Sequence, residues 1–553
     1  MPLNSRVVAK SARSPHVVLL AGEFTAETVR ELGFGVTVLR CDGTDRDALL
    51  AALAEADAVL VGDAPVIDAE AIAAAPELKI IARAGAALGN VDVAAATERG
   101  IQVTDAPEAE ALSVAELTVG MLLAVARNIP QAHAALTAGA WQRSLYSGVE
   151  LSGKVLGIVG LGRVGGLVAE RLRAFGMDVV AYDPYAAPER AAALGVRLAP
   201  FDQVLAAADF LSVHVPGTGE TAGLLDFDAL NRVRPEVRLV SVSGTGAFDT
   251  NELYAALKEG RVAAAALDLS AAREPADAAL AGLDNVVVTP GLAVRSDEAG
   301  QRAGAVAAEA VRLALAGEYG PNVVNTHGHA IGDTVRPWLA LTERLGEVLT
   351  AAAGSIPQHL EVRLLGDLAA EQAGILELAA LKGVLSGPSR HPTSLVNAPL
   401  RARERGMTVR LVTETEAGSH RSAVALRGIR ADGGSVRLAG TLSGLRRHPR
   451  LIEAFGHELE LPVDGNLAFV SYPDRPGAVG AIGEELADAD VNIESLWVAR
   501  DADTGTALAA LVTDVPVAKD VLASAAARVE ASHSCTVRAG GKPQPSGPSG
   551  RYR

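Results

Sequence analysis

The sequence predicts an α/β fold made of two doubly wound lobes, followed by two smaller α+β domains. Three observations support this fold class. Short apolar segments alternate with Ala- and Leu-rich helical segments through about the first 325 residues, as in parallel sheets that helices cover on both faces. A glycine-rich turn at residues 160–165 joins one apolar segment to a helical one. After residue 325 the alternation gives way to a mixed pattern of strands and helices.

The apolar segments form two series. The strands expected in the first lobe are residues 17–20, 36–39, 58–61 and 80–82. Those expected in the second lobe are residues 155–159, 179–182, 210–215, 239–242, 263–268 and 286–289. Helical segments near residues 113–128 and 297–316 are the expected connections between the lobes. The two series therefore predict two Rossmann-like lobes.

The C-terminal part of the chain has a different organisation. Residues 338–353 predict a helix and residues 359–365 a strand of an α+β domain. In the last domain the expected strands are residues 467–472, 492–498 and 507–512. With a helix at residues 478–487 and another after the last strand, this β-α-β-β-α order is typical of a ferredoxin-like module. Residues 540–553 are rich in Gly, Pro and Ser, which predicts a disordered tail.

Composition limits the classes of function. The 553-residue chain has 66 acidic and 50 basic residues and a formal net charge of −16, which disfavours binding to nucleic acid or anionic lipid. Cys41 and Cys535 are too few for a disulfide scaffold, and the histidines show no metal-ligand spacing. The N-terminal residues contain no apolar segment of signal-peptide length. We therefore expect a cytoplasmic protein without a metal site, a nucleic-acid partner or a membrane partner.

The glycine-rich turn predicts a dinucleotide site. Gly160, Gly162 and Gly165 fit G-x-G-x-x-G between a strand and a helix, where the backbone can approach a pyrophosphate at the helix N-terminus. Asp183 ends the next strand, about 18 residues beyond Gly165, where an acid meets the ribose hydroxyls. Residues 184–188 contain no Lys or Arg that would bind a 2′-phosphate. We therefore predict NAD, in preference to NADP, as the cofactor.

Four further segments lie around this turn: Asn128-Ile129-Pro130-Gln131-Ala132-His133, Trp141, Gly148-Val149-Glu150-Leu151 and Ala181-Tyr182-Asp183-Pro184-Tyr185. Together with the glycine-rich turn, they resemble the D-3-phosphoglycerate dehydrogenase family of D-isomer-specific 2-hydroxyacid dehydrogenases. The resemblance extends from about residue 15 to residue 539 and matches the long form of the family. It implies a substrate lobe (1–114, completed by 297–325), an NAD lobe (115–296), an intervening domain of the allosteric substrate-binding type (326–463), an ACT domain (464–539) and a tail (540–553).

The resemblance also implies an activity and its ligands. The family oxidises 3-phosphoglycerate with NAD in the first step of serine biosynthesis. Further cofactor contacts are implied for Arg163, Val164, Val215 and Asp268. Positions that bind the effector serine in actinobacterial-type members match Tyr472, Asp474 and Asn492. Because the family forms tetramers, a homo-oligomer is expected, with a 2-hydroxy acid or a serine-like amino acid as its small-molecule partner.

The chain departs from the family pattern at the catalytic positions. The arginine that holds the substrate carboxylate is replaced by Gly244, and the histidine that takes the hydroxyl proton by Gly291. The glutamate that orients this histidine matches Glu274, in a segment one residue longer than the family pattern. The substrate loops differ as well: a glycine has become Ala87, an aspartate Gly89, and a Ser-Asn pair Ala109-Glu110.

Two hypotheses follow from these departures. Losing a general acid–base group lowers a rate by roughly 10²–10⁴-fold, and losing a charge-stabilising donor by roughly 10²–10³-fold. The first hypothesis is an NAD-binding, catalytically impaired paralogue with a regulatory role, assembling with itself or with an active paralogue. The alternative is an active NAD-dependent 2-hydroxyacid dehydrogenase with an altered substrate, in which groups such as His214 or Arg295 replace the missing ones. The sequence leaves both hypotheses open.

Overall fold

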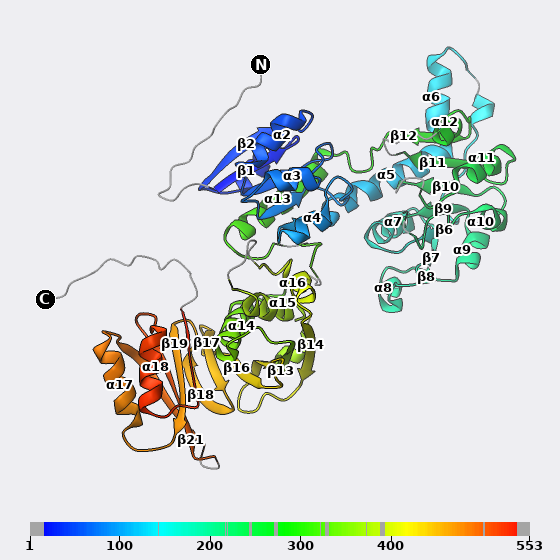
Figure 1. Ribbon diagram of the computed structural model, residues 1–553. Helices are drawn as coiled ribbons and strands as arrows, with labels where there is room; N and C mark the ends of the chain where they lie inside the picture. Colours follow the sequence, from blue (N-terminus) through cyan, green and yellow to red (C-terminus); the bar gives the residue numbers. More distant parts are fainter. Residues whose placement is uncertain are drawn as a thin grey trace.

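The computed structural model describes residues 16–141, 143–215, 217, 219–242, 246–269, 275–320, 322–326, 331–371, 373–387, 393–501 and 504–538. In sequence order the chain forms two parallel α/β lobes, an α+β domain and a C-terminal domain built on an antiparallel sheet (Figure 1). Two of the predicted site residues, Gly244 and Glu274, lie outside the described residues, as does the predicted tail.

The first lobe is a five-stranded parallel sheet with the order β2-β1-β3-β4-β5. Its strands are β1 (His16–Ala21), β2 (Val36–Cys41), β3 (Ala58–Val61), β4 (Ile80–Arg83) and β5 (Gln102–Thr104). Its helices are α1 (Ala26–Glu31), α2 (Arg46–Leu53), α3 (Ala69–Ala74) and α4 (Val93–Glu98). The first four strands confirm the prediction. The sequence analysis missed β5 because this three-residue strand has no continuous apolar run.

The second lobe is a seven-stranded parallel sheet with the order β12-β11-β10-β9-β6-β7-β8. Its strands are β6 (Val155–Val159), β7 (Asp178–Tyr182), β8 (Arg197–Leu198), β9 (Phe210–Val213), β10 (Arg238–Ser241), β11 (Ala264–Asp268) and β12 (Val286–Thr289). Its helices are α7 (Arg163–Ala174), α8 (Pro188–Ala193), α9 (Phe201–Ala207), α10 (Phe227–Arg232), α11 (Thr250–Lys258) and α12 (Pro275–Ala281). The strand order reverses between β6 and β9, and such a switch point is where parallel sheets of this kind bind ligands.

Two long helices connect the lobes, α5 (Pro107–Arg127) and α13 (Asp297–Leu315) (Figure 1). Helix α13 packs on β3 and β4, and α5 packs against both α13 and α7. Among the described helices, α5 alone is long and apolar enough to span a membrane. Its packing between other helices and strands accounts for this composition. Helix α6 (Ile129–Thr137) follows α5, buries none of its side chains and projects from the second lobe (Figure 1).

The third unit is a six-stranded sheet, β14-β13-β15-β16-β17-β18, with α14 packed on it, α15 on α14, and α16 on α15. The helices are α14 (Trp338–Ala353), α15 (Ile375–Val384) and α16 (Ala398–Glu404). The strands are β13 (His359–Gly366), β14 (Thr408–Glu414), β15 (Ser422–Ile429), β16 (Ser435–Ser443), β17 (His448–Ala454) and β18 (His457–Pro462). Helix α14 and strand β13 confirm the two elements predicted for this unit.

The C-terminal unit has the ferredoxin-like order, with antiparallel strands arranged β20-β21-β19-β22. Its elements are β19 (Asn466–Pro473), α17 (Ala478–Asp488), β20 (Ile493–Asp501), β21 (Thr506–Thr513), α18 (Lys519–Arg528) and β22 (His533–Val537). The prediction lacked β22, in which polar residues interrupt the apolar pattern. Apolar residues of β19, β21 and β22 join one hydrophobic cluster with the third unit, so these two units share a core.

Candidate functional site

The glycine-rich turn lies at the switch point of the second lobe, between β6 and α7. Gly160 has a φ of +95°, in the left-handed region that favours glycine. A Cβ atom on Gly160 would lie 2.9 Å from Cγ1 of Val215, and a Cβ atom on Gly165 would collide with the carbonyl oxygen of Gly160. The close approach of helix to strand therefore requires glycine at both positions.

The first turn of α7 faces open space. Gly162 is the N-cap residue, no side chain caps this helix end, and a Cβ atom on Gly162 would meet nothing within 4 Å. The first N–H groups of a helix lack partners within the helix, and the partial positive charge there favours an anion. This open, uncapped end fits the pyrophosphate of a dinucleotide.

Asp183 follows β7 and lies beside the turn. Its Oδ2 accepts a hydrogen bond from the N–H of Leu161 (2.8 Å) and its Oδ1 from the N–H of Tyr185 (2.9 Å). The exposed Tyr185 hydroxyl donates to Oε2 of Glu220 (3.0 Å), a contact that raises the pKa of Tyr185. Two carboxylates thus flank this end of the site, which suits ribose hydroxyls and disfavours a 2′-phosphate.

The other residues predicted for this part of the cofactor site are Arg163, Val164 and Val215, and they have different contacts. Arg163 pairs with Glu108 in the first turn of α5, at 3.0 Å between Nη1 and Oε1. Val164 packs against the core beneath α7, and Val215 packs beside Gly160. The structure therefore brings together the three glycines, Arg163, Val164, Asp183 and Val215, which we call the cofactor edge.

Asp268 ends β11 and fixes the loop that follows β12. Its buried carboxylate accepts hydrogen bonds from Oγ1 of Thr289 (2.5 Å), N–H of Leu292 (2.8 Å) and N–H of Ala293 (2.8 Å). These three contacts determine the course of the backbone through Gly291. Asp268 thus acts on the site through this loop, and its contact with a cofactor stays a prediction.

Gly291 stands where the family pattern has histidine, and its backbone is unsuited to most side chains. Its φ is +72°, in the left-handed region, and a Cβ atom there would lie 3.4 Å from the carbonyl oxygen of Leu269. The sequence has three histidines before residue 326: His16, His133 and His214. His16 begins β1 and faces Asp57, and His133 is exposed on the projecting helix α6. Only His214 lies near the cofactor edge.

His214 follows β9 and contacts the back of the glycine turn. Its Nε2 shares a hydrogen bond with Oγ of Ser212 (2.8 Å), and burial lowers the pKa of His214 to about 4. A catalytic base works best with a pKa near the operating pH, so an imidazole with this pKa is a poor acceptor for a substrate proton.

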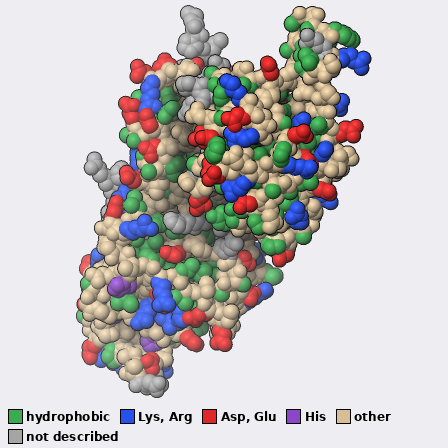
Figure 2. Space-filling model, turned by 90° about the vertical axis from the view of Figure 1, so that its right-hand side faces the viewer, with side chains coloured by type: hydrophobic (Ala, Val, Ile, Leu, Met, Phe, Trp, Pro, Cys, Tyr) green, Lys and Arg blue, Asp and Glu red, His purple; other side chains and the backbone are tan. Residues whose placement is uncertain are grey.

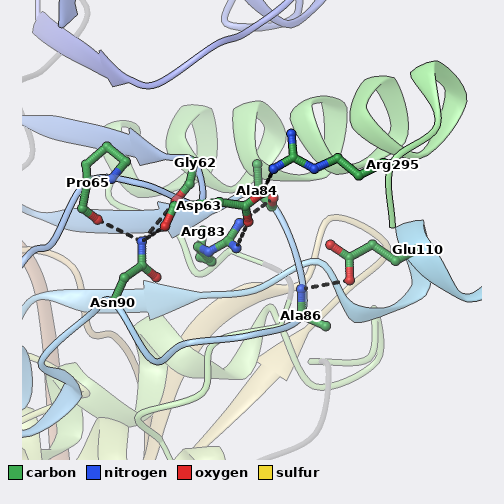
Figure 3. A network of polar contacts seen from close by, with 9 residues as sticks. All are labelled: Gly62, Asp63, Pro65, Arg83, Ala84, Ala86, Asn90, Glu110 and Arg295. Atoms are coloured by element: carbon green, nitrogen blue, oxygen red, sulfur yellow. Dashed lines mark hydrogen bonds and ion pairs between the residues drawn. The ribbon is translucent and has the colours of Figure 1, made fainter. Parts of the chain in front are cut away.

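The first lobe contributes a second polar group at the carboxyl ends of β3 and β4 (Figure 3). The buried Arg83 donates from Nη1 to the carbonyl of Ala84 (2.6 Å) and pairs with Asp63. Asp63 also lies 3.9 Å from Nη2 of Arg295, which comes from the loop before α13. The sequence analysis selected neither Arg83 nor Asp63. The signal that could have found Arg83 is an arginine at the end of a strand of buried apolar residues.

The loop after β4 faces the first turn of α5. Asn90 holds this loop by donating from Nδ2 to the carbonyls of Gly62 (2.9 Å) and Pro65 (2.8 Å). The N–H of Ala86 donates to Oε2 of Glu110 (3.3 Å), as Figure 3 shows. We call these residues, with Arg83, Asp63 and Arg295, the substrate edge. No group of three or more His, Cys, Asp or Glu side chains in the described part of the chain could hold a metal ion.

The three predicted effector residues do not meet within one chain. Tyr472 is buried near the end of β19, and Asp474 follows it, with its Oδ1 3.5 Å from Nε of Arg500. Asn492 precedes β20 and is exposed. Both strands pair antiparallel with β21, so they run in the same direction, and the start of β20 lies beside the start of β19. The rise per residue of a strand therefore places Asn492 about 20 Å away from Tyr472.

Comparison with known proteins agrees with the two-lobed fold and with NAD binding by the second lobe. The family model "D-isomer specific 2-hydroxyacid dehydrogenase, NAD binding domain" matches residues 119–293, and "D-3-phosphoglycerate dehydrogenase intervening domain" matches residues 334–455. The TT0316 protein from Thermus thermophilus is 33% identical, with a TM-score of 0.51 over 56% of this chain and 99% of that one. D-lactate dehydrogenase with NAD+ from Lactobacillus jensenii has the same fold, at 22% identity and a TM-score of 0.50 over 56% and 99% of the two chains.

The fold and the matching family model thus define a D-isomer-specific 2-hydroxyacid dehydrogenase, whose second lobe is the NAD-binding domain. D-3-phosphoglycerate dehydrogenase from Mycobacterium tuberculosis is 46% identical over 515 residues, which cover 93% of this chain and 98% of that protein. The enzyme of the same name from Methanocaldococcus jannaschii is 36% identical over 484 residues, covering 87% and 91%. The chain belongs to the D-3-phosphoglycerate dehydrogenase family.

Proposed function

We propose that this protein is cytoplasmic and binds NAD, that it oxidises 3-phosphoglycerate slowly or not at all, and that it has a regulatory role. The observation that carries the proposal is the loop after β12. At the position of the expected histidine stands Gly291, with a φ of +72° and no acid–base group. The replacement of the expected arginine by Gly244 supports the same conclusion from the sequence alone.

The chemistry explains why these positions matter. NAD, when bound, accepts a hydride from the carbon that bears the hydroxyl. The protein must take the hydroxyl proton and hold the substrate carboxylate while this happens. His214 is a poor substitute base because burial holds its pKa at about 4. Without a histidine at position 291, Glu274 has no imidazole to orient.

The test is a direct rate measurement. NADH formation from 3-phosphoglycerate, followed at high enzyme concentration, should give a turnover below about 1 s⁻¹, against a median near 10 s⁻¹ for enzymes. Calorimetric titration of the same preparation should show NAD binding. A turnover near the median would refute the catalytic part of the proposal, and absence of NAD binding to the folded protein would refute the cofactor part.

A second candidate function is an active dehydrogenase for a different 2-hydroxy acid. The observation that favours it is Arg295, whose exposed guanidinium lies at the substrate edge, because a guanidinium can hold a substrate carboxylate. NADH formation across a panel of 2-hydroxy acids distinguishes the two candidates. A turnover of several per second on any member of the panel would favour the active enzyme.

The regulatory role that we propose needs a homo-oligomer or an assembly with an active paralogue. Ile129 and Leu136 of α6 and the following Trp141 and Leu145 are exposed apolar side chains that suit a contact with a second copy. On the face that Figure 2 shows, acidic and basic side chains are mixed over the surface. Because Tyr472 and Asn492 lie at opposite ends of their sheet, a single serine-like effector that contacts both would need two chains.

Mixing two variants tests this shared effector site. Asp474→Ala and Asn492→Ala each remove one half of the shared effector site. Each variant alone should therefore lose the rise in melting temperature caused by serine. Co-expression should restore it in the mixed oligomers, because some interfaces then carry two intact halves. Lack of any serine response in the wild type would refute the effector, and pull-down of no paralogue would refute the mixed assembly.

A further inference from the structure

At the end of β4, groups suited to binding an anion already hold a carboxylate of the chain itself. Ala86 donates its backbone N–H to Oε2 of Glu110, which stands in the first turn of α5. A Cβ atom on Gly85 would lie 2.6 Å from Nη1 of Arg83 and 2.7 Å from Oε1 of Glu110, so the guanidinium and the carboxylate both border the backbone of this loop. A backbone N–H beside an arginine is a typical binding place for an anionic substrate group.

Around Arg83 and Ala86, negative charge already matches or exceeds positive charge. Arg83 is paired with Asp63, which also lies near Arg295. Burial raises the pKa of Glu110, and the charge of Asp105 acts in the same direction while Arg83 opposes it. Counting Asp105, three carboxylates (Asp63, Asp105 and Glu110) therefore lie near the guanidinium groups of Arg83 and Arg295. An incoming dianion finds no unpaired positive charge on Arg83.

We infer that Glu110 is a specificity-determining residue that excludes phosphorylated substrates, and that the substrate class of this site is a 2-hydroxy acid with an uncharged side chain. The inference rests on the proposed use of the substrate edge as the substrate site. A phosphate dianion must either displace the Glu110 carboxylate from the N–H of Ala86 or lie beside it. Like charges at such short range repel each other strongly, whereas an uncharged side chain meets no such repulsion.

Binding measurements on the full chain test this inference without relying on turnover. 3-Phosphoglycerate and D-lactate are titrated calorimetrically, in the presence of NADH, into the wild type, Glu110→Gln and Glu110→Asn. The first variant keeps an acceptor for the N–H of Ala86, and the second introduces the residue type of the family pattern. Glu116→Gln is the matched control, because it removes the same charge from an exposed position of α5.

We expect 3-phosphoglycerate to bind both Glu110 variants at least about tenfold more tightly than the wild type, the effect of one close like charge. D-lactate should change by less than about threefold, and Glu116→Gln should match the wild type. The inference is wrong if the wild type binds 3-phosphoglycerate as tightly as the variants, or if neither variant binds it better. Thermal melting shows whether each variant is folded.

A titration with inorganic phosphate in the absence of NADH separates this inference from the proposed function. If the protein does not bind NAD, the proposed function fails, but Glu110→Gln should still bind phosphate more tightly than the wild type. If NAD binds and phosphate affinity is the same in all variants, the proposed function stands and the role of Glu110 is refuted.

Discussion

The cofactor edge and the substrate edge both contact the first turn of α5, through Glu108 and Glu110, yet they differ in what determines them. At the cofactor edge, backbone geometry selects the residues, because Gly160 and Gly165 leave no room for a Cβ atom. At the substrate edge, side chains supply the chemistry, and Glu110 can replace another residue while the strand beneath remains packed. A site determined by backbone geometry is thus tied to the fold, whereas a site determined by side chains can change independently.

The largest expected effect on NAD binding comes from breaking the backbone geometry of the cofactor edge. Gly165→Ala places a Cβ atom against the carbonyl oxygen of Gly160, so the turn must shift and NAD affinity should fall by about a hundredfold or more. Calorimetric titration with NAD measures this loss. Gly300→Ala on α13 is the control, since a Cβ atom there meets nothing within 4 Å, and its NAD affinity should match the wild type. Equal affinity in both variants would contradict a turn set by backbone geometry.

A smaller effect is expected at the one side chain on which the cofactor edge depends. Asp183→Asn keeps the size of the side chain but removes its charge, so NAD should bind about tenfold more weakly, the typical value of one charged hydrogen bond. The preference for NAD over NADP should decrease as well. Titration with both dinucleotides measures this, with Asp178→Asn, exposed at the other end of β7, as the control. An unchanged preference would mean that Glu220, and not Asp183, discriminates against NADP.

The same difference explains how much could be predicted from the sequence. The buried strands of both lobes and the glycine turn were predictable, because burial and left-handed backbone limit the residues allowed there. The pairing of Arg83 with Asp63 could not be predicted, since Arg83 ends β4 and Asp63 follows β3, and the sequence does not indicate which strand ends meet. The separation of Tyr472 from Asn492 could not be predicted either, because it depends on the strand order within the sheet. The short strand β5 was not predicted, because its pairing partners, and not its composition, define it.

The third prediction concerns the pH dependence of stability at the cofactor edge. Because burial lowers the pKa of His214 to about 4, the folded state holds the neutral imidazole, while the unfolded chain binds a proton near pH 6.5. His214 therefore contributes stability above pH 6.5, and this contribution is lost as the pH falls toward 4, by up to about 3 kcal/mol. In His214→Gln, denaturant unfolding of the second lobe should lose that much less stability over this range. His133→Gln, on the exposed helix α6, should behave as the wild type.

The smallest effect is expected from the charge of Glu110 at the substrate edge. Burial raises the pKa of this carboxyl group, so the folded state favours its protonated form. Stability linked to Glu110 is thus present at low pH and is lost as the pH rises through the raised pKa. At pH 7, Glu110→Gln should melt about 1–3 °C higher than the wild type, and at pH 4 the two should melt together.

Glu116→Gln should show no such pH-dependent gain, because Glu116 is exposed on the same helix. If Glu110→Gln instead melts below the wild type at pH 7, attraction to Arg83 outweighs the burial of the carboxylate. The substrate edge would then resemble the cofactor edge, as a region where Glu110 is needed for the fold. A higher melting temperature would show the opposite, that the chain keeps a carboxylate at this edge although the fold is more stable without its charge.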